Sequence, residues 1–232
     1  MDTRYAIYYT PPRDSPLGRF AIAWFGWDHY LGQPAEPLAT RVLTRDQHLE
    51  VTASPRRYGF HATLKAPFRL AAGQDESALC EALEDFAGSQ APVTIPGLFV
   101  ASLNGFLALV PAQVPPELPD LADAFVAQLD HFRAPDPEDL ARRRAAGLTP
   151  RQQALLDAWG YPYVLEEWRF HMTLTDTLQD GVREAVLEEL LPWVEIFARR
   201  PLRIDSIALF RQPSRETPFT VLRLFPLKGA LP

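Results

Sequence analysis

Two stretches of the chain alternate between polar and apolar residues and share one pattern, although they lie about 110 residues apart. The first is Tyr58-Gly-Phe-His-Ala-Thr-Leu-Lys-Ala-Pro-Phe68 and the second is Trp168-Arg-Phe-His-Met-Thr-Leu-Thr175. Because successive side chains of a strand point to opposite faces, the alternation predicts two strands, each with one buried apolar face. The predicted polar faces carry Gly59, His61, Thr63 and Lys65 in the first strand, and Arg169, His171, Thr173 and Thr175 in the second.

The same series of elements is predicted after each of these strands. After the first strand, Asp75 is a suitable N-cap for a helix over 76–87, and Asn104-Gly105 joins hairpin strands over 98–103 and 106–110. After the second strand, the apolar spacing predicts a helix over 182–199 and then a hairpin with strands over 203–210 and 219–225. Elsewhere the pattern predicts a strand over 4–10, a buried helix over 16–27, mostly loop over 33–54 and helices over 115–160.

This repetition indicates a duplicated fold. The two hairpin turns follow their histidine strands after about 43 and about 44 residues. We therefore predict a bilobal α+β fold, in which two antiparallel sheets flank a central cleft and the helices lie outside. The chain is expected to form one bilobal domain over 1–232, with lobe one over about 1–114, a helical linking segment over about 115–160 and lobe two over about 161–232. Exchange of strands between the lobes is left open.

Composition and charge narrow the classes of function. The 232 residues, 47% of them apolar, suffice for a substantial core. A net charge of −6 is unusual for a protein that follows a nucleic-acid backbone, so no DNA partner is expected. No apolar run approaches the roughly 18 residues of a membrane span, and the first residues lack the pattern of a signal peptide. With a single cysteine, Cys80, the sequence predicts a cytoplasmic protein that has no membrane partner.

The repeated motif carries the candidate chemistry. Opening a cyclic phosphodiester requires one group that removes a proton from water and one that delivers a proton to the leaving alkoxide. Histidine is suited to both tasks because its ordinary pKa lies near neutrality, and a hydroxyl donates to the phosphoryl oxygens where charge develops. His61, Thr63, His171 and Thr173 are therefore the candidate catalytic residues, and the scheme requires no metal and no cofactor.

The two His-x-Thr motifs resemble those of the two-histidine (2H) phosphoesterase superfamily, which includes RNA 2′,3′-cyclic phosphodiesterases and 2′–5′ RNA ligase-like proteins. A closer resemblance covers residues 56–68, 132–135, 159–163 and 170–175, and is to an uncharacterised branch often encoded with phosphonate-utilisation genes. The resemblance implies a cyclic phosphodiesterase, a hydrolase whose substrate is a small phosphorylated ribose or nucleotide. It also implies that an RNA end is a less favoured substrate.

Further positions are candidate substrate-binding residues. Lys65 and Arg169 share the predicted strand faces of the two histidines, whereas Arg57 and Tyr58 lead into the first strand. Tyr161 and Tyr163 are candidates for an aromatic lid that stacks a base. Farther along the linking segment, the arginines at 142–144 are interpreted as a solvated helix face or as partners of the acids before them.

Two alternative functions remain open from the sequence. A divalent-metal phosphohydrolase would use both histidines with Asp176 or Glu167, but those acids fall on the strand face opposite His171. A non-catalytic module would bind a phosphorylated metabolite or an RNA end. A Gly-x-x-x-x-Gly-Lys-[Ser/Thr] loop is absent from the sequence, which argues against nucleotide hydrolysis of the P-loop kind. The sequence leaves open the exact substrate, the role of each histidine, reverse transfer and the oligomeric state.

Overall fold

The computed structural model describes residues 3–198 and 200–230, and the described strands form two main antiparallel sheets. The larger sheet has the order β11-β10-β1-β4 and the smaller has the order β6-β7-β8. Strands β2 (Trp27–Asp28) and β3 (Gln33–Pro34) form one further short pair, and β5 (Val93–Ile95) and β9 (Leu202–Ile204) form another. The larger sheet consists of β1 (Arg4–Tyr9), β4 (Ala62–Phe68), β10 (Ser206–Gln212) and β11 (Thr220–Pro226), and the smaller of β6 (Leu98–Leu103), β7 (Phe106–Pro111) and β8 (Met172–Thr173).

Each sheet combines the histidine strand of one half of the chain with the hairpin of the other half. Strand β4 follows His61 and lies in the sheet of the C-terminal hairpin β10–β11, whereas β8 follows His171 and pairs with β7 of the first hairpin. The sheets therefore do not correspond to the continuous stretches 1–114 and 161–232, because strands are exchanged between the halves. Folding of either sheet requires both halves of the chain.

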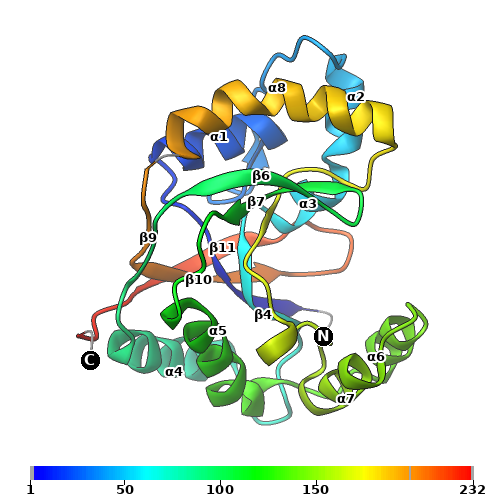
Figure 1. Cartoon of the computed structure of the whole chain (residues 1–232). Helices are drawn as coiled ribbons and strands as arrows, with labels where there is room; N and C mark the ends of the chain where they lie inside the picture. The colour runs from blue at the N-terminus through cyan, green and yellow to red at the C-terminus, as the bar shows by residue number, and fades with distance from the viewer. Residues whose placement is uncertain (1–2, 199, 231–232) are drawn as a thin grey trace.

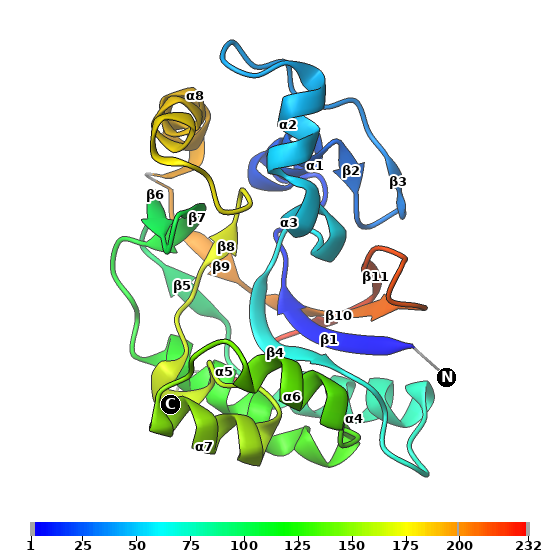
Figure 2. The ribbon, with the colours of Figure 1, turned by 90° about the vertical axis from the view of Figure 1, so that its right-hand side faces the viewer.

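Helices cover the outer faces of the two sheets, as Figures 1 and 2 show. Helices α4 (Glu76–Ser89) and α5 (Glu117–Gln128) pack against the larger sheet, and α8 (Asp180–Ala198) packs against the smaller sheet and against α1 (Pro16–Phe25). The α+β class with antiparallel sheets and outer helices is confirmed. The linking segment is helical as predicted, with α6 (Pro137–Arg144), α7 (Pro150–Trp159) and the 3₁₀ turns η1 (Asp130–Phe132) and η2 (Leu165–Glu167).

Local signals explain many of the element boundaries. The Asp75 side chain accepts a hydrogen bond from the backbone N–H of Ala78 and caps α4, as predicted. In the first hairpin, Asn104 and Gly105 both have positive φ, 48° and 92°, which is the conformation that a two-residue type I′ turn requires. Helix α8 includes Pro192, and its predicted last position, 199, lies outside the described residues.

Four sequence-based expectations are corrected by the structure. Residues 33–54 are not mostly loop, because Thr44 caps α2 (Arg45–Val51) with a capping box and α3 (Ala53–Tyr58) follows directly. The predicted strand over 203–210 is interrupted at Asp205, and its two parts, β9 and β10, pair with different strands. Only Met172–Thr173 of the second alternating stretch forms a strand. Val182, the first apolar position of the helix predicted over 182–199, does not face the core, because it is 41% exposed.

Two separate apolar clusters lie on the two faces of the larger sheet. On the helix-covered face, Tyr5, Ile7 and Tyr9 belong to the main core, which continues into the smaller sheet through residues such as Leu109 and Met172. On the other face, a small cluster of Ala6, Tyr8, Ala208, Phe210 and Phe219 is also buried. This alternation along β1 places Arg4 on the same strand face as Tyr8.

Lys65 belongs to the interior of the fold. The register between β1 and β4 shifts between the pairs Ile7–Lys65 and Tyr8–Thr63, so the strict alternation predicted from His61 to Lys65 fails at this point. Lys65 is 3% exposed, and its Nζ lies 2.9 Å from Asp130 Oδ1 and 3.2 Å from the carbonyl oxygen of Val126. The ion pair ties β4 to η1, the 3₁₀ turn that follows α5. We therefore leave Lys65 out of the candidate site.

In the part of the chain that the structure describes, every helix is too short or too polar to cross a membrane.

Replacement of Asp130 by Ala is expected to destabilise the protein by about 3–5 kcal/mol, because it leaves the buried Lys65 ammonium without its carboxylate. Urea unfolding measures this loss. The double variant Lys65→Met with Asp130→Ala should recover the part that comes from the unpaired ammonium, whereas the part that comes from Arg133, which also donates to Asp130, should remain. Asp157→Ala is the matched control: it breaks the exposed pair with Arg144 and should cost less than about 1 kcal/mol. Equal losses for the two single variants would contradict the structural role of Lys65.

Candidate functional site

His61 lies directly before β4, and its imidazole is held by the backbone two residues earlier. Its Nδ1 lies 2.8 Å from the carbonyl oxygen of Gly59. Because a carbonyl oxygen only accepts hydrogen bonds, Nδ1 carries the hydrogen and Nε2 of the neutral ring is the acceptor. Gly59 has φ +75°, and a Cβ at this position would lie 2.9 Å from the Cβ of His29. A glycine is therefore required where the chain enters the motif.

The half-buried His61 ring packs against an aromatic surface on the face of the larger sheet that carries Tyr8. The Tyr8 ring stacks on it with a centroid separation of 3.7 Å and an interplanar angle of 21°. Desolvation among these rings lowers the pKa of His61 to about 3. The charges of His171 and His29 lower the pKa further, whereas the hydrogen bond to Gly59 raises it. His61 is therefore neutral at physiological pH and able to accept a proton at Nε2.

His171 repeats this arrangement in the second motif. Its Nδ1 lies 2.9 Å from the carbonyl oxygen of Arg169, which is again the residue two positions earlier. The half-buried ring lies beside Phe106 of the first hairpin, with a centroid separation of 6.0 Å. Both histidines therefore direct the hydrogen of Nδ1 into their own backbone and leave Nε2 for a bound molecule.

The two motifs are tied to each other by direct hydrogen bonds. Trp168 Nε1 donates to the carbonyl oxygen of Thr63 over 2.7 Å. After the second motif, the N–H of Asp176 donates to the carbonyl oxygen of Val51, and the Asp176 carboxylate accepts from the N–H of Ser54. These bonds hold the His171 segment against β4 and against the helices that precede it. The contribution of His171 to the low pKa of His61 is consistent with this proximity.

Thr63 and Thr173 occupy corresponding positions in the two strands. Both are half-buried and follow a buried residue, Ala62 or Met172, so each threonine shares the strand face of its histidine. Thr175 was predicted to lie on the same face, but it is buried and its Oγ1 accepts a hydrogen bond from the N–H of Leu107. Thr175 therefore has a structural role in joining the second motif to the first hairpin.

The predicted substrate-binding residues differ in their surroundings. Tyr58 is half-buried, stacks on Phe219 and lies 6.4 Å from the His61 ring, measured between ring centroids. Arg57 is exposed, and the exposed Arg169 guanidinium donates to the carbonyl oxygens of Glu166 and Trp168.

The two tyrosines of the predicted lid contact each other. Tyr161 and Tyr163 form an edge-to-face pair with ring centroids 5.6 Å apart, and Tyr163 is 45% exposed. The Arg143 guanidinium lies 4.8 Å from the centroid of the Tyr161 ring.

Two residues of this region were missed from the sequence. Tyr8 and Arg4 lie in a short strand that reads as ordinary core, because all six residues of β1 are buried. Their relation to His61 arises from the pairing of β1 with β4, which the pattern of the N-terminal strand alone does not reveal. A predicted topology in which β1 pairs with β4 would have identified Tyr8 and Arg4 as neighbours of this region.

Within residues 3–198 and 200–230, no three His, Cys, Asp or Glu side chains are grouped closely enough to hold a metal ion. The acids named for the metal alternative have other partners: Asp176 accepts from the N–H of Ser54, and Glu167 accepts from the side chain of Gln152.

A family described as a protein of unknown function (DUF1045) matches residues 63–220, which include Thr63 and the whole second motif. The chain belongs to this family. The predicted membership of an uncharacterised branch agrees with that description.

Two curated relatives extend the comparison over nearly the whole chain. A protein of Janthinobacterium sp. (strain Marseille) is 38% identical over 232 residues, and one of Laribacter hongkongensis (strain HLHK9) is 35% identical over 222 residues. Both carry the name ribose 1,5-bisphosphate phosphokinase PhnN. The matches cover 98% and 95% of this chain but 51% of each relative, so the chain spans about half the length of these proteins.

Solved structures with similar architecture include E. coli LigT complexed with 3′-AMP and the protein TT0787 of Thermus thermophilus. LigT is 16% identical with a TM-score of 0.45, and the match covers 99% of this chain and 100% of LigT. TT0787 is 14% identical with a TM-score of 0.48, and the match covers 98% of this chain and 100% of TT0787. TM-scores below 0.5 do not establish a shared activity.

The burial of His61 predicts an imidazole that stays neutral on acidification. In ¹⁵N NMR spectra of the imidazole nitrogens, His61 should show the Nδ1–H tautomer and no titration between pH 8 and pH 5, because its pKa lies near 3. Replacing Tyr8 by Ala should expose the ring to water and raise its pKa toward the ordinary value of about 6.5. A midpoint near pH 6.5 in the unmodified protein would contradict this account of the site.

Proposed function

We propose that the protein is a phosphoesterase that hydrolyses a cyclic phosphodiester by general acid–base catalysis with His61 and His171. One observation carries the proposal: both imidazoles bond through Nδ1 to the carbonyl oxygen two residues earlier, and both keep Nε2 for the substrate. Such an arrangement supplies two proton-transfer groups in a fixed tautomer beside two hydroxyls. The scheme uses no metal ion and no organic cofactor.

We assign the role of base to His61 and that of acid to His171, and the lowered pKa of His61 supports a neutral His61. Neutral His61 accepts a proton at Nε2 from the attacking water while the water oxygen bonds to phosphorus. Protonated His171 delivers its proton from Nε2 to the leaving ester oxygen as the phosphorus–oxygen bond breaks. The ring opens to a phosphomonoester and a free hydroxyl, and proton exchange with solvent restores both imidazoles.

The two threonines complete the mechanism. Negative charge increases on the non-bridging phosphoryl oxygens in the transition state, and a correctly placed hydroxyl stabilises it by donating a hydrogen bond. Thr63 and Thr173 lie two residues after the histidines on the same strand faces. We assign the donation to these two hydroxyls.

A small phosphorylated ribose or nucleotide is the proposed substrate class. The two relatives are named for an enzyme that acts on a ribose bisphosphate. These relatives are about twice as long as this chain, so the kinase activity in their name belongs to the longer proteins. A Gly-x-x-x-x-Gly-Lys-[Ser/Thr] loop is missing from this sequence, so we do not assign the kinase reaction to this chain. The acidic net charge of −6 also favours a small substrate over an RNA polymer. The resemblance to a branch associated with phosphonate-utilisation genes suggests a role in phosphonate metabolism.

Turnover of a substrate panel tests the proposal. The panel contains nucleoside 2′,3′-cyclic phosphates and ribose cyclic phosphates, and ³¹P NMR in excess chelator follows the formation of phosphomonoester. Replacing either His61 or His171 by Ala should reduce kcat by roughly 10²–10⁴-fold, because each variant lacks one proton-transfer group. Binding of the substrate should persist in the variants.

Matched controls distinguish this mechanism from the alternatives. His131→Ala alters an exposed histidine of the linking segment and should leave turnover unchanged. Turnover that chelation abolishes would indicate a metal-dependent hydrolase. Binding without turnover of any panel member by the unmodified protein would indicate a non-catalytic module and would refute the proposed hydrolysis.

A further inference from the structure

Arg4 is a buried cation whose bonded partner is uncharged. The residue is 8% exposed, and its Nε and Nη2 both donate to the side-chain oxygen of Gln212, over 2.8 and 2.5 Å. Gln212 is itself fully buried, and its amide donates to the carbonyl oxygen of Thr217, which fixes the orientation of its oxygen. A buried guanidinium is ordinarily paired with a carboxylate, since an uncompensated charge is costly to bury.

A continuous series of aromatic contacts leads from His61 to Arg4. The His61 ring lies beside Tyr58, Tyr58 stacks on Phe219 with centroids 5.4 Å apart, and the Arg4 guanidinium lies 5.3 Å from the centroid of the Phe219 ring. Tyr8, which stacks on His61, is four residues from Arg4 on the same face of β1, a distance of about 13 Å along the strand. Arg4 therefore lies at the far end of the surface that supports His61.

Arg143 approaches the same region from helix α6. Its guanidinium lies over the ring of Tyr161, and its Nε donates to Asp139 over 2.6 Å. Burial raises the pKa of Tyr8 well above 10, while the charges of Arg4 and Arg143 act in the opposite direction. Arg4 and Asp139, the hydrogen-bond partner of Arg143, line the same pocket, so the two arginines approach one region of the surface.

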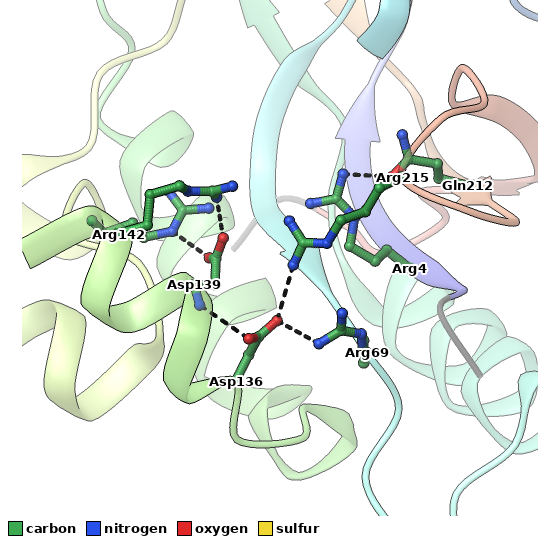
Figure 3. A network of polar contacts seen from close by, with 8 residues as sticks. Arg4, Arg69, Asp136, Asp139, Arg142, Gln212 and Arg215 are labelled. Carbon is green, nitrogen blue, oxygen red and sulfur yellow. Dashed lines mark hydrogen bonds and ion pairs between the residues drawn. The ribbon is translucent and has the colours of Figure 1, made fainter.

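Positive charge exceeds negative charge in this cluster, although the chain as a whole is acidic. Figure 3 shows Arg69 and Arg215 directed toward Asp136 at the start of α6, where Asp136 accepts from both, while the neighbouring Arg4 is directed toward Gln212. Asp139 is likewise shared by two arginines, Arg142 and Arg143. If Glu216 beside Arg215 is added to the two aspartates, the cluster has five guanidinium groups and three carboxylates: Arg4, Arg69, Arg142, Arg143, Arg215, Asp136, Asp139 and Glu216.

We propose that Arg4 and Arg143, with the hydroxyls of Tyr8, Tyr58 and Tyr161, form a second phosphate-binding subsite, which receives a phosphate group of the substrate remote from the one that His61 and His171 hydrolyse. This inference rests on the proposed function and deepens it: the preferred substrate carries two phosphates at opposite ends of a small sugar. We call these five residues the distal subsite.

The distal subsite has the chemistry that a phosphomonoester requires. A guanidinium presents five N–H donors in a planar fork that matches two phosphate oxygens, and the bonds of Arg4 to Gln212 use two of these donors. Phenolic hydroxyls donate further hydrogen bonds to a phosphate dianion. The bound dianion would supply the negative charge that Gln212 does not provide to Arg4, and the aromatic rings between the two subsites would contact the sugar.

A matched pair of substrates tests the distal subsite: a ribose 1,2-cyclic phosphate with a phosphate on C5, and the same compound without it. The unmodified protein should prefer the doubly phosphorylated compound in kcat/KM. Arg143→Gln and Arg4→Lys should each reduce this preference roughly 10- to 100-fold, because charge-assisted contacts to phosphate are lost or lose their bidentate geometry. Arg144→Gln is the matched control on the same helix: Arg144 pairs with Asp157 at the surface, and its loss should leave the preference unchanged.

The outcomes separate the distal subsite from the proposed reaction. Circular dichroism first establishes that each variant is folded. If replacement of the buried Arg4 prevents folding, Arg143→Gln alone tests the distal subsite. An equal effect of Arg143→Gln on both substrates would overturn the distal subsite and leave the proposed hydrolysis standing. If the unmodified protein hydrolyses neither compound, calorimetry with ribose 5-phosphate decides the matter: a weakening of 10-fold or more in Arg143→Gln but not in Arg144→Gln supports the subsite, and unchanged affinity in both overturns it.

Discussion

The account of this protein depends on one interaction that occurs twice, the hydrogen bond from a histidine Nδ1 to the carbonyl oxygen two residues earlier. The bond measures 2.8 Å at His61 and 2.9 Å at His171. It fixes the tautomer of each neutral ring, so Nε2 is the nitrogen that remains for proton exchange in the proposed reaction. A flexible imidazole would lose catalytic power, because proton transfer requires the nitrogen within hydrogen-bonding distance of the reacting oxygen.

The exchange of hairpins between the halves explains how a duplicated sequence forms a single site. Since β4 lies with the C-terminal hairpin and β8 with the first hairpin, neither motif can be positioned until both halves have folded. The bond from Trp168 to the carbonyl oxygen of Thr63 then joins the motifs directly. The symmetry is incomplete: His61 lies on a buried aromatic surface with Tyr8, whereas His171 has Phe106 as its ring neighbour. Different surroundings for the same residue type favour different roles in proton transfer.

Short-range signals in the sequence predicted a large part of the fold. The cap at Asp75, the Asn104-Gly105 turn and the alternation from His61 to Leu64 depend on neighbours in sequence, and the structure has all three, although the alternation fails at Lys65. Long-range pairing was not predictable in the same way. The ion pair of Lys65 with Asp130 joins residues 65 positions apart, and the relation of Arg4 and Tyr8 to His61 requires knowledge that β1 pairs with β4. The sequence thus pointed to the candidate reacting groups, while the residues that surround them emerged only from the tertiary structure.

A crystal structure with a transition-state analogue tests the central claim most directly. A cyclic ester of a ribose diol with vanadate places five oxygens around the vanadium atom in the geometry of in-line attack. The oxygens that represent the attacking and leaving groups lie at opposite apices. The account predicts that Nε2 of His61 and Nε2 of His171 each lie about 3 Å from one apical oxygen, with the Thr63 and Thr173 hydroxyls on the equatorial oxygens. Vanadate bound elsewhere, or in contact with one imidazole alone, would contradict the two-histidine mechanism.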